Sequence, residues 1–306
     1  MKKYVDEIVF LILNYNCCEL TKKCVNSIRE MCLQFKVVIV DNDSFDNSYK
    51  ILNSVYAKEN NIYLIKSTSN VGYAKGNNIG FKFIEENIKS AKYVVVMNPD
   101  IVIWDIEVIK NLYAFLEKYN DYAIVSCQSV FNNEWRMGDD YGWKYPTKIN
   151  LFWAGTFFGK LFVHSMNEKY TSLHLIDNEL ATAVDVVSGC FFMARLDDIK
   201  KVDYFDDRTF LYYEENIISK KLLTINKKEA ILLNYYFYHN HQHKDKSLID
   251  YKKRLFDRKC FHDSKMIYIN NYSNITGVLL LFCKFVNNVD FQIKKIVFGF
   301  LAIIKP

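Results

Sequence analysis

The stretch from Tyr93 to Asp100, YVVVMNPD, limits the possible folds of this chain more than any other stretch. The residues from Tyr93 to Met97 form an apolar, β-branched run, which predicts a strand that is buried on both of its faces. Asn98 and Asp100 follow at the carboxyl end of this strand, where open α/β sheets bind their ligands. A carboxylate in such a turn can also act only as a turn cap, so both interpretations of Asp100 stay open here.

Strand and helix patterns alternate along the first hundred residues. Short apolar runs predict strands at residues 8–13, 37–40, 62–65 and 93–97, and apolar residues at helical spacing predict helices at 20–32, 51–55 and 74–88. This βαβαβαβ order favours an α/β fold with a parallel sheet and right-handed crossovers. A helix at 105–119 and a strand at 123–127 continue the pattern.

Polar residues follow each of the four predicted strands. They occupy 14–16, 41–44, 70–78 and 98–100. Because the carboxyl ends of parallel strands lie at one edge of a sheet, we expect these side chains to face a common ligand. Asparagine and aspartate can hydrogen-bond a nucleotide or hold a cation, so the sequence predicts a binding site at this edge.

The third of these loops, NVGYAKGNNIG, spaces Gly72, Gly76 and Gly80 four residues apart. This spacing matches neither the dinucleotide-binding motif G-x-G-x-x-G nor the phosphate loop G-x-x-x-x-G-K-[ST]. The glycines fit a ligand-binding loop, and they equally fit the entry of a helix that packs closely on its neighbours. The sequence leaves these two interpretations open.

Five motifs, taken in order, resemble the family 2 glycosyltransferases, and most closely their bacterial rhamnosyltransferase-like branch. The motifs are NYN, VIVDNDSFDNS, NVGYAKGNNIGF, YVVVMNPDI and VDVVSGCFFMARLDDIKKVDYFDDRTFLYYEEN, and the resemblance covers roughly residues 8–245. It implies a GT-A fold with a mostly parallel central sheet flanked by helices, a nucleotide-sugar donor and inversion at the anomeric carbon. It also implies a catalytic domain at 1–245, with a nucleotide-binding half at about 1–127 and an acceptor-binding half at about 128–245.

The same resemblance implies roles for individual residues. The implied donor-binding residues are Asn16, Asp41, Asn70, Gly72, Asn78, Asn98 and Asp100. Asp100 stands where the family's metal-binding aspartate stands, so Mg²⁺ or Mn²⁺ is the implied cofactor, and His239 or His241 is a second candidate ligand near the diphosphate. On the acceptor side the implied residues are Gly189 and Glu214, with Glu215 as the general base.

Two positions depart from the wider family pattern. Members with a D-x-D motif carry an acid where this chain has Asn98, although its own subgroup commonly shows N-P-D. The family reads Glu-Asp where this chain has Glu214 and Glu215. Glutamate keeps a carboxylate of similar pKa but reaches one methylene further than aspartate. The alternative is that Glu214 and Glu215 are solvated acids at a helix start, where the helix dipole favours them.

Two segments of the second half carry open interpretations. Residues 131–178 are rich in Trp, Tyr, Phe and Gly, and they fit either a cover for the core or an aromatic face for a sugar or a lipid-linked acceptor. The run VDVVSGCFFMA at 184–194 predicts a strand that is interrupted by Ser188 and Gly189.

Residues 246–306 are predicted to form a basic, amphipathic helical tail. Twelve Lys and Arg stand against five Asp from Asn240 to the end, although the whole chain has a net charge of only +5. The apolar runs GVLLLFCKFV and IVFGFLAII fall short of the roughly 20 residues of a membrane span. They fit helices that lie on a membrane surface with anionic lipid, and they also fit helices packed on the catalytic domain.

The ends of the chain and its cysteines bear on location. Two lysines precede a short apolar run at the N-terminus, but Asp6 and Glu7 interrupt it, so we interpret the run as a strand rather than a signal peptide. None of the eight cysteines shows a C-x-x-C spacing, which favours reduced, mostly buried thiols. We therefore expect a cytoplasmic protein that is peripheral on the inner face of the cell membrane.

The expected function is transfer of rhamnose or another hexose from a UDP- or dTDP-sugar to a hydroxyl of a cell-surface polysaccharide or lipid-linked precursor. One alternative is a non-catalytic nucleotide-sugar-binding partner of an assembly complex. A sugar nucleotidyltransferase is a weaker alternative, because only Lys22 and Lys23 lie near the first loop. Nucleic-acid binding is unsupported, since the basic surplus lies beside apolar runs.

Overall fold

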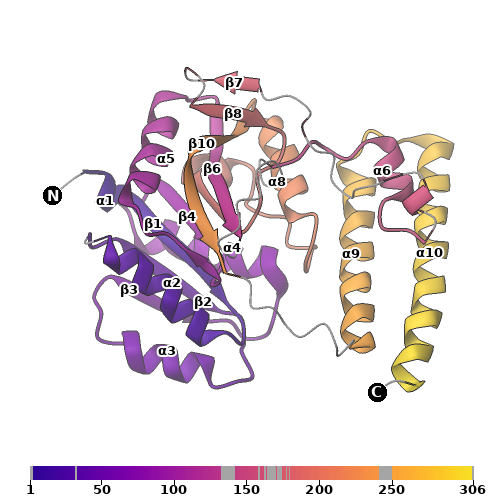
Figure 1. Cartoon of the computed structure of the whole chain (residues 1–306), viewed down its shortest axis with the longest axis horizontal. Coiled ribbons are helices and arrows are strands. Elements are labelled where there is room, and N and C mark those ends of the chain that lie inside the picture. Colours follow the sequence, from indigo (N-terminus) through magenta and orange to yellow (C-terminus); the bar gives the residue numbers. More distant parts are fainter. Residues whose placement is uncertain are drawn as a thin grey trace.

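The structure is a computed structural model that describes residues 3–31, 33–131, 142–157, 159–161, 163, 170, 174–176, 178, 180–240 and 250–304. One twisted sheet forms its centre, and helices cover both faces of the sheet (Figure 1). Two long C-terminal helices stand side by side at one end of the molecule.

The first half of the chain confirms the predicted alternation. Its elements are α1 (Lys3–Glu7), β1 (Ile8–Asn14), α2 (Cys18–Glu30), β2 (Lys36–Asp41), α3 (Ser48–Tyr56), β3 (Ile62–Lys66), α4 (Gly72–Asn87) and β4 (Tyr93–Met97). All five residues of β4 are buried, as the apolar run predicted. Strands β3, β2, β1 and β4 are neighbours in that order and are parallel to one another.

The second half adds further strands and helices. Its elements are β5 (Ile101–Val102), α5 (Ile106–Lys118), β6 (Tyr122–Phe131), α6 (Lys148–Trp153), η1 (Gly159–Leu161), β7 (His174–Ile176), β8 (Ala181–Val184), β9 (Phe191–Arg195), α7 (Leu196–Lys201), α8 (Glu214–Leu223), β10 (Lys228–His239), α9 (Tyr251–Asn271) and α10 (Gly277–Ile304). The full strand order is β3-β2-β1-β4-β9-β6-β10-β8-β7, and β5 pairs with β10.

The sheet is mixed rather than parallel throughout. Strand β9 lies between β4 and β6 and is antiparallel to both, and β8 is antiparallel to β10. The run at 184–194 is therefore not one interrupted strand, because β8 and β9 occupy different places in the sheet. Residues 185–190 connect the two strands, and this connection crosses the edge where the predicted site residues lie.

The core confirms that two of the spaced glycines serve close packing. A Cβ atom on Gly76 would lie 2.7 Å from a methyl of Leu13, and one on Gly80 would lie 2.1 Å from a methyl of Leu11. Helix α4 can therefore approach β1 only because these positions lack side chains. Helices α2, α3 and α5 pack on the opposite face of the sheet. The seven described cysteines are all free, as predicted.

A third apolar cluster joins the C-terminal helices to the rest of the protein. It contains Leu151 and Phe152 of α6, Ile217 of α8, and Tyr268 of α9. Helix α10 packs along α9 and against α6. None of the described helices is both long and apolar enough to cross a membrane.

Candidate active site

The loops after β1 and β2 are tied together at the carboxyl edge of the sheet. Asn14 Nδ2 donates to Asp41 Oδ2 at 2.7 Å, and Ser44 Oγ donates to the same oxygen at 2.8 Å. The backbone N–H of Asn16 donates to Ser44 Oγ at 2.9 Å. Asn16 itself has a left-handed backbone with φ of 53°, a conformation that asparagine tolerates better than most residues. Asn16 and Asp41, which were predicted to bind the nucleotide-sugar donor, thus lie in one hydrogen-bonded unit.

The loop after β3 joins this unit through Asn42. Asn42 Nδ2 donates to Asn70 Oδ1 at 3.0 Å and to the Gly72 carbonyl at 3.1 Å. Gly72 has φ of 83°, and a Cβ there would lie 2.3 Å from the carbonyl oxygen of Phe210. Only glycine fits this position, because both the backbone angle and the contact exclude a side chain.

Asn78 has different hydrogen-bond partners from the other residues that were predicted to bind the nucleotide-sugar donor. Its Nδ2 donates to the carbonyl of Phe205 at 2.9 Å, and its Oδ1 accepts from the N–H of Phe205 at 3.0 Å. Both ends of the buried amide are occupied by the backbone of a distant loop. These bonds give Asn78 a structural role, and its predicted contact with the sugar donor stays a prediction.

Asp100 and His239 lie together where β4 and β10 end. Asp100 Oδ2 is 3.2 Å from His239 Nε2, and the N–H of Asn240 donates to the Asp100 carbonyl at 2.9 Å. Strand β5, which follows Asp100 directly, pairs with the end of β10 and fixes this approach. The other candidate, His241, lies outside the described residues.

A carboxylate and an imidazole are suitable ligands for a divalent cation that also binds substrate phosphates. Mg²⁺ in such sites takes one or two carboxylates and completes its shell with phosphate and water oxygens. No group of three His, Cys, Asp or Glu side chains forms a ready-made metal site within the part of the chain that the structure describes. Asp100 and His239 therefore fit a site that is complete only with substrate present.

A cavity of about 310 Å³ opens beside these strand ends. Asn98 lines it from the end of β4, Gly189 from the connection between β8 and β9, and Glu214 and Glu215 from the start of α8. Asp100 follows Asn98 by two residues. The structure thus brings Asn98, which was predicted to bind the sugar donor, and the predicted acceptor-side residues to one cavity. The size of this cavity suits a small ligand.

Glu215 makes a close approach to Gly189 inside this cavity. The N–H of Gly189 donates to Glu215 Oε1 at 3.3 Å, and a Cβ on Gly189 would lie only 2.8 Å from that oxygen. Glutamate reaches one methylene further than the aspartate of the family pattern, and here its carboxylate meets this N–H group. Burial raises the pKa of Glu215, which makes its carboxylate a stronger base.

Glu214 differs from its neighbour in burial and in partners. It is 2% exposed, and its Oε2 has no hydrogen-bond partner among the described residues. Burial, followed by the charge of Glu215, raises the pKa of Glu214. Two neighbouring carboxyl groups whose pKa values are both raised by burial are suited to acid–base chemistry. Neither is the solvated helix-start acid of the alternative interpretation.

The turn before α8 is held in an unfavourable backbone conformation. Tyr212 and Tyr213 have φ of 75° and 65°, in the left-handed region that residues other than glycine rarely adopt. Each such residue costs on the order of 1–3 kcal/mol, and such strain concentrates at functional sites. Here the strained turn determines where Glu214 and Glu215 enter the cavity.

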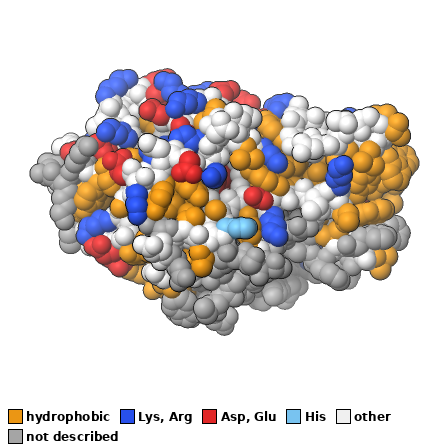
Figure 2. Space-filling view, turned by 90° about the horizontal axis from the view of Figure 1, so that it is seen from above, with side chains coloured by type: hydrophobic (Ala, Val, Ile, Leu, Met, Phe, Trp, Pro, Cys, Tyr) orange, Lys and Arg blue, Asp and Glu red, His pale blue; other side chains and the backbone are white. Residues whose placement is uncertain are grey.

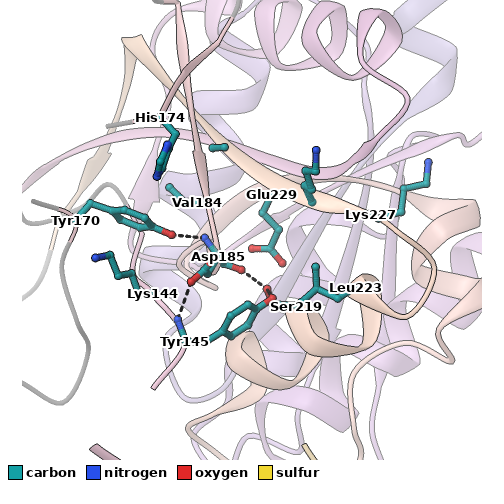
Figure 3. A pocket seen from close by; sticks show the side chains of 12 residues that line it. Lys144, Tyr145, Tyr170, His174, Val184, Asp185, Ser219, Leu223, Lys227 and Glu229 are labelled. Atoms are coloured by element: carbon teal, nitrogen blue, oxygen red, sulfur yellow. Dashed lines mark hydrogen bonds between the residues drawn. The ribbon is translucent and has the colours of Figure 1, made fainter. Parts of the chain in front are cut away.

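A second cavity of about 410 Å³ lies further along α8 (Figure 3). Its Glu229 carboxylate is turned toward Asp185 and Ser219 in Figure 3. Glu229 Oε2 accepts from the N–H of Val187 at 2.6 Å, and burial raises the pKa of Glu229 to about 8. Val187 lies two residues before Gly189, so Glu229 helps to hold the segment that contacts Glu215.

Sequence reasoning missed several residues of the site. Tyr73, Trp143, Tyr212 and Phe261 also line the cavity of Glu215, and the hydroxyl of Tyr73 donates to the Gly189 carbonyl. Tyr73 stands inside the glycine loop, so its position beside Gly72 was the available signal. Phe261 lies in the predicted tail, and no local pattern connected it to this cavity.

The fold is of the GT-A class. The structure resembles Staphylococcus aureus TarS 1–349 in complex with UDP-GlcNAc, with a TM-score of 0.54, 15% identity, and coverage of 95% of this chain and 73% of that one. It also resembles the mannosyltransferase PcManGT of Pyrobaculum calidifontis in complex with GDP-Man and Mn²⁺, with a TM-score of 0.57, 12% identity, and coverage of 98% and 76%.

The chain belongs to glycosyl transferase family 2, whose family model matches residues 9–202. A curated relative is the low-salt glycan biosynthesis hexosyltransferase Agl10 of Haloferax volcanii, which is 24% identical over 212 residues. This match covers 69% of the present chain and 60% of the relative, so the chain spans less than two thirds of that protein's length.

Proposed function

We propose that the protein is an inverting glycosyltransferase that moves rhamnose or another hexose from a UDP- or dTDP-sugar to a hydroxyl of a cell-surface polysaccharide or a lipid-linked oligosaccharide precursor. The observation that carries the proposal is the shared cavity, in which Glu215 is held by Gly189 near Asn98 and the strand end that precedes Asp100. The relatives support the donor class, since one is a hexosyltransferase and others are complexes with UDP-GlcNAc or GDP-Man.

The arrangement supports a single displacement. The carboxylate of Glu215 takes the proton of the acceptor hydroxyl as the hydroxyl oxygen forms its bond to the anomeric carbon. The bond from that carbon to the diphosphate oxygen breaks, and the electron pair leaves with the nucleoside diphosphate. A base with a raised pKa suits this step, because proton transfer is most efficient when the pKa lies near the working pH.

The cofactor that we propose is Mg²⁺ or Mn²⁺, held by Asp100 and His239 together with phosphate oxygens of the donor. When bound, the cation would neutralise negative charge on the departing diphosphate. The Mn²⁺ complex of the mannosyltransferase with the same fold supports this choice. The hydrogen-bonded loops around Asp41 and Asn70 would hold the nucleoside.

The direct test combines a donor screen with product stereochemistry. Thermal shift with UDP-, dTDP- and GDP-sugars in the presence of Mn²⁺ identifies the donor, because a ligand that binds only the folded state raises the melting temperature. Proton NMR of the product from an octyl glycoside acceptor then reports the anomeric configuration. Inversion supports the proposal, whereas retention of the donor's configuration would overturn it.

We also propose that α10 binds the inner face of the cell membrane and places the enzyme beside a lipid-linked acceptor. Figure 2 shows apolar side chains gathered at the end of the molecule that the C-terminal helices form. The exposed apolar residues of α10 include Val278, Leu281, Phe282, Phe285, Val289, Ile293, Ile296, Phe300 and Ile303. Exposed basic residues of α9, such as Lys252, Arg254 and Arg258, suit an anionic lipid surface.

Vesicle sedimentation tests this location. Wild-type protein should sediment with vesicles of phosphatidylcholine and phosphatidylglycerol, and the double variant Phe285→Glu with Ile296→Glu should remain in the supernatant. Val55→Glu, a matched change at another exposed apolar position, should bind like the wild type. Equal sedimentation of the α10 variant and the wild type would contradict the membrane proposal.

A further inference from the structure

Helix α9 reaches from the C-terminal part of the chain into the cavity of Glu215. Phe261 lines this cavity together with Gly189 and Glu215. The Phe261 ring lies 5.9 Å from the ring of Tyr212 and 5.6 Å from that of Tyr213, measured between centroids. Phe261 is only partly buried.

Several contacts fix α9 against the loop that precedes Glu214. Ser264 Oγ donates to the Leu211 carbonyl at 2.9 Å, and the hydroxyl of Tyr272 donates to Asp206 Oδ2 at 2.8 Å. On the other side of the helix, the buried Lys265 Nζ donates to the Ala154 carbonyl at 2.8 Å. The position of Phe261 is therefore set by hydrogen bonds along the length of α9, and not by its ring contacts alone.

The cavity combines aromatic surface with polar side chains. Trp143, Tyr212 and Phe261 supply aromatic side chains to its wall, and Glu214 and Glu215 supply carboxyl groups. A pyranose ring offers both an apolar C–H face and a rim of hydroxyls.

We propose that Phe261 is an acceptor-binding residue, whose ring forms with Trp143 and Tyr212 the wall against which a pyranose ring of the acceptor packs while one hydroxyl faces Glu215. This inference rests on the proposed function, and it extends that function by naming a sugar ring as the group recognised beside the base. It also makes helix α9 part of the active site, where the sequence predicted a separate tail.

Saturation-transfer NMR with simple sugars tests this role. Methyl glycosides of glucose, galactose, mannose, N-acetylglucosamine and rhamnose serve as probes, with UDP and Mg²⁺ present and the full chain as receptor. We expect signal from at least one glycoside with the wild type and with Phe261→Tyr, which keeps the ring. Phe261→Ala should bind that glycoside about five- to tenfold more weakly.

The control variant is Phe256→Ala. Phe256 lies on the same helix and packs on Phe210 with centroids 5.6 Å apart, but it does not line the cavity. Its loss should leave glycoside binding unchanged. UDP binding, measured by calorimetry, should be the same for the wild type and both alanine variants.

Three results would overturn the assignment of Phe261. The first is that Phe261→Ala binds the glycoside as well as the wild type does. The second is that Phe261→Ala loses UDP binding together with glycoside binding. The third is that the wild type binds UDP but gives no signal with any methyl glycoside. Failure of the proposed function would look different, since the wild type would then bind neither UDP nor any nucleotide sugar.

Discussion

Replacing Gly189 by alanine should impair the base Glu215 while residue 215 itself stays unchanged. The φ angle of Gly189 lies outside the left-handed region, so the backbone itself accepts alanine. The new Cβ would lie 2.8 Å from Glu215 Oε1, which is about 0.6 Å short of the 3.4 Å at which ordinary contact begins. The carboxylate or the segment around residue 189 must therefore move, and a shift of about this amount restores ordinary contact.

The size of this movement sets the expected loss of activity. A misplacement of about 1 Å in a reacting group costs on the order of a hundredfold in rate. We therefore expect Gly189→Ala to lower kcat roughly ten- to hundredfold, while the Kd for the nucleotide stays unchanged. Release of nucleoside diphosphate measures kcat, and calorimetry measures the Kd. Gly299→Ala is the matched control, because a Cβ at that position has open space around it.

A second substitution sharpens this prediction. Glu215→Asp shortens the side chain by one methylene, so the Asp carboxylate should retreat from position 189 and leave room for the alanine methyl group. The double variant Gly189→Ala with Glu215→Asp should therefore lose much less activity than the product of the two single losses predicts. Full activity of Gly189→Ala, or independent effects of the two changes, would refute the reasoning from this contact.

Three further predictions concern the metal, the buried glutamate and the strained turn. EDTA should abolish turnover, and added Mn²⁺ should restore it; undiminished turnover in EDTA would remove the metal from the proposal. Asp100→Asn should need at least about tenfold more Mn²⁺ than the wild type for half-maximal thermal stabilisation by UDP. The raised pKa of Glu229 contributes stability that is present below about pH 4.5 and is lost as the pH rises to about 8. In urea melts across this window, the free energy of unfolding of Glu229→Gln should therefore rise relative to that of the wild type by up to about 1.4 kcal/mol per pH unit. A difference that does not change with pH would contradict the assignment. Tyr212→Ala should lower kcat, because it removes ring contacts that hold the strained turn, whereas Tyr212→Phe should keep most of it, and equal loss in both variants would point to the hydroxyl instead.

The order of strands and helices in the first half could be read from the sequence because it depends on local patterns. Each strand there is a short apolar run, and each polar loop follows its strand directly. The resemblance offered His239 or His241 as a second metal ligand beside Asp100, and of these two the structure describes His239. Periodicity alone could not show that β5 pairs with β10 and so brings the side chains of Asp100 and His239 within 3.2 Å.

The features that the sequence did not reveal depend on contacts between distant residues. VDVVSGCFFMA is one apolar run, but the buried Glu229 and a bridge between Trp143 and Val186 hold the segment between its two halves. The hydrogen bonds of Asn78 to the backbone of Phe205 were not visible in the sequence, because the two residues are 127 positions apart. The aromatic contacts of Phe261 with Tyr212 and Tyr213 are equally invisible to a local pattern.

The central claim is that Glu215 removes the proton of the acceptor hydroxyl. Its most direct test is turnover by Glu215→Gln, a variant of nearly the same shape, measured with the donor that the thermal-shift screen identifies. The account predicts that transfer falls at least about a hundredfold while the Kd for the nucleotide stays within about threefold of the wild-type value. Transfer by Glu215→Gln at the wild-type rate would contradict it.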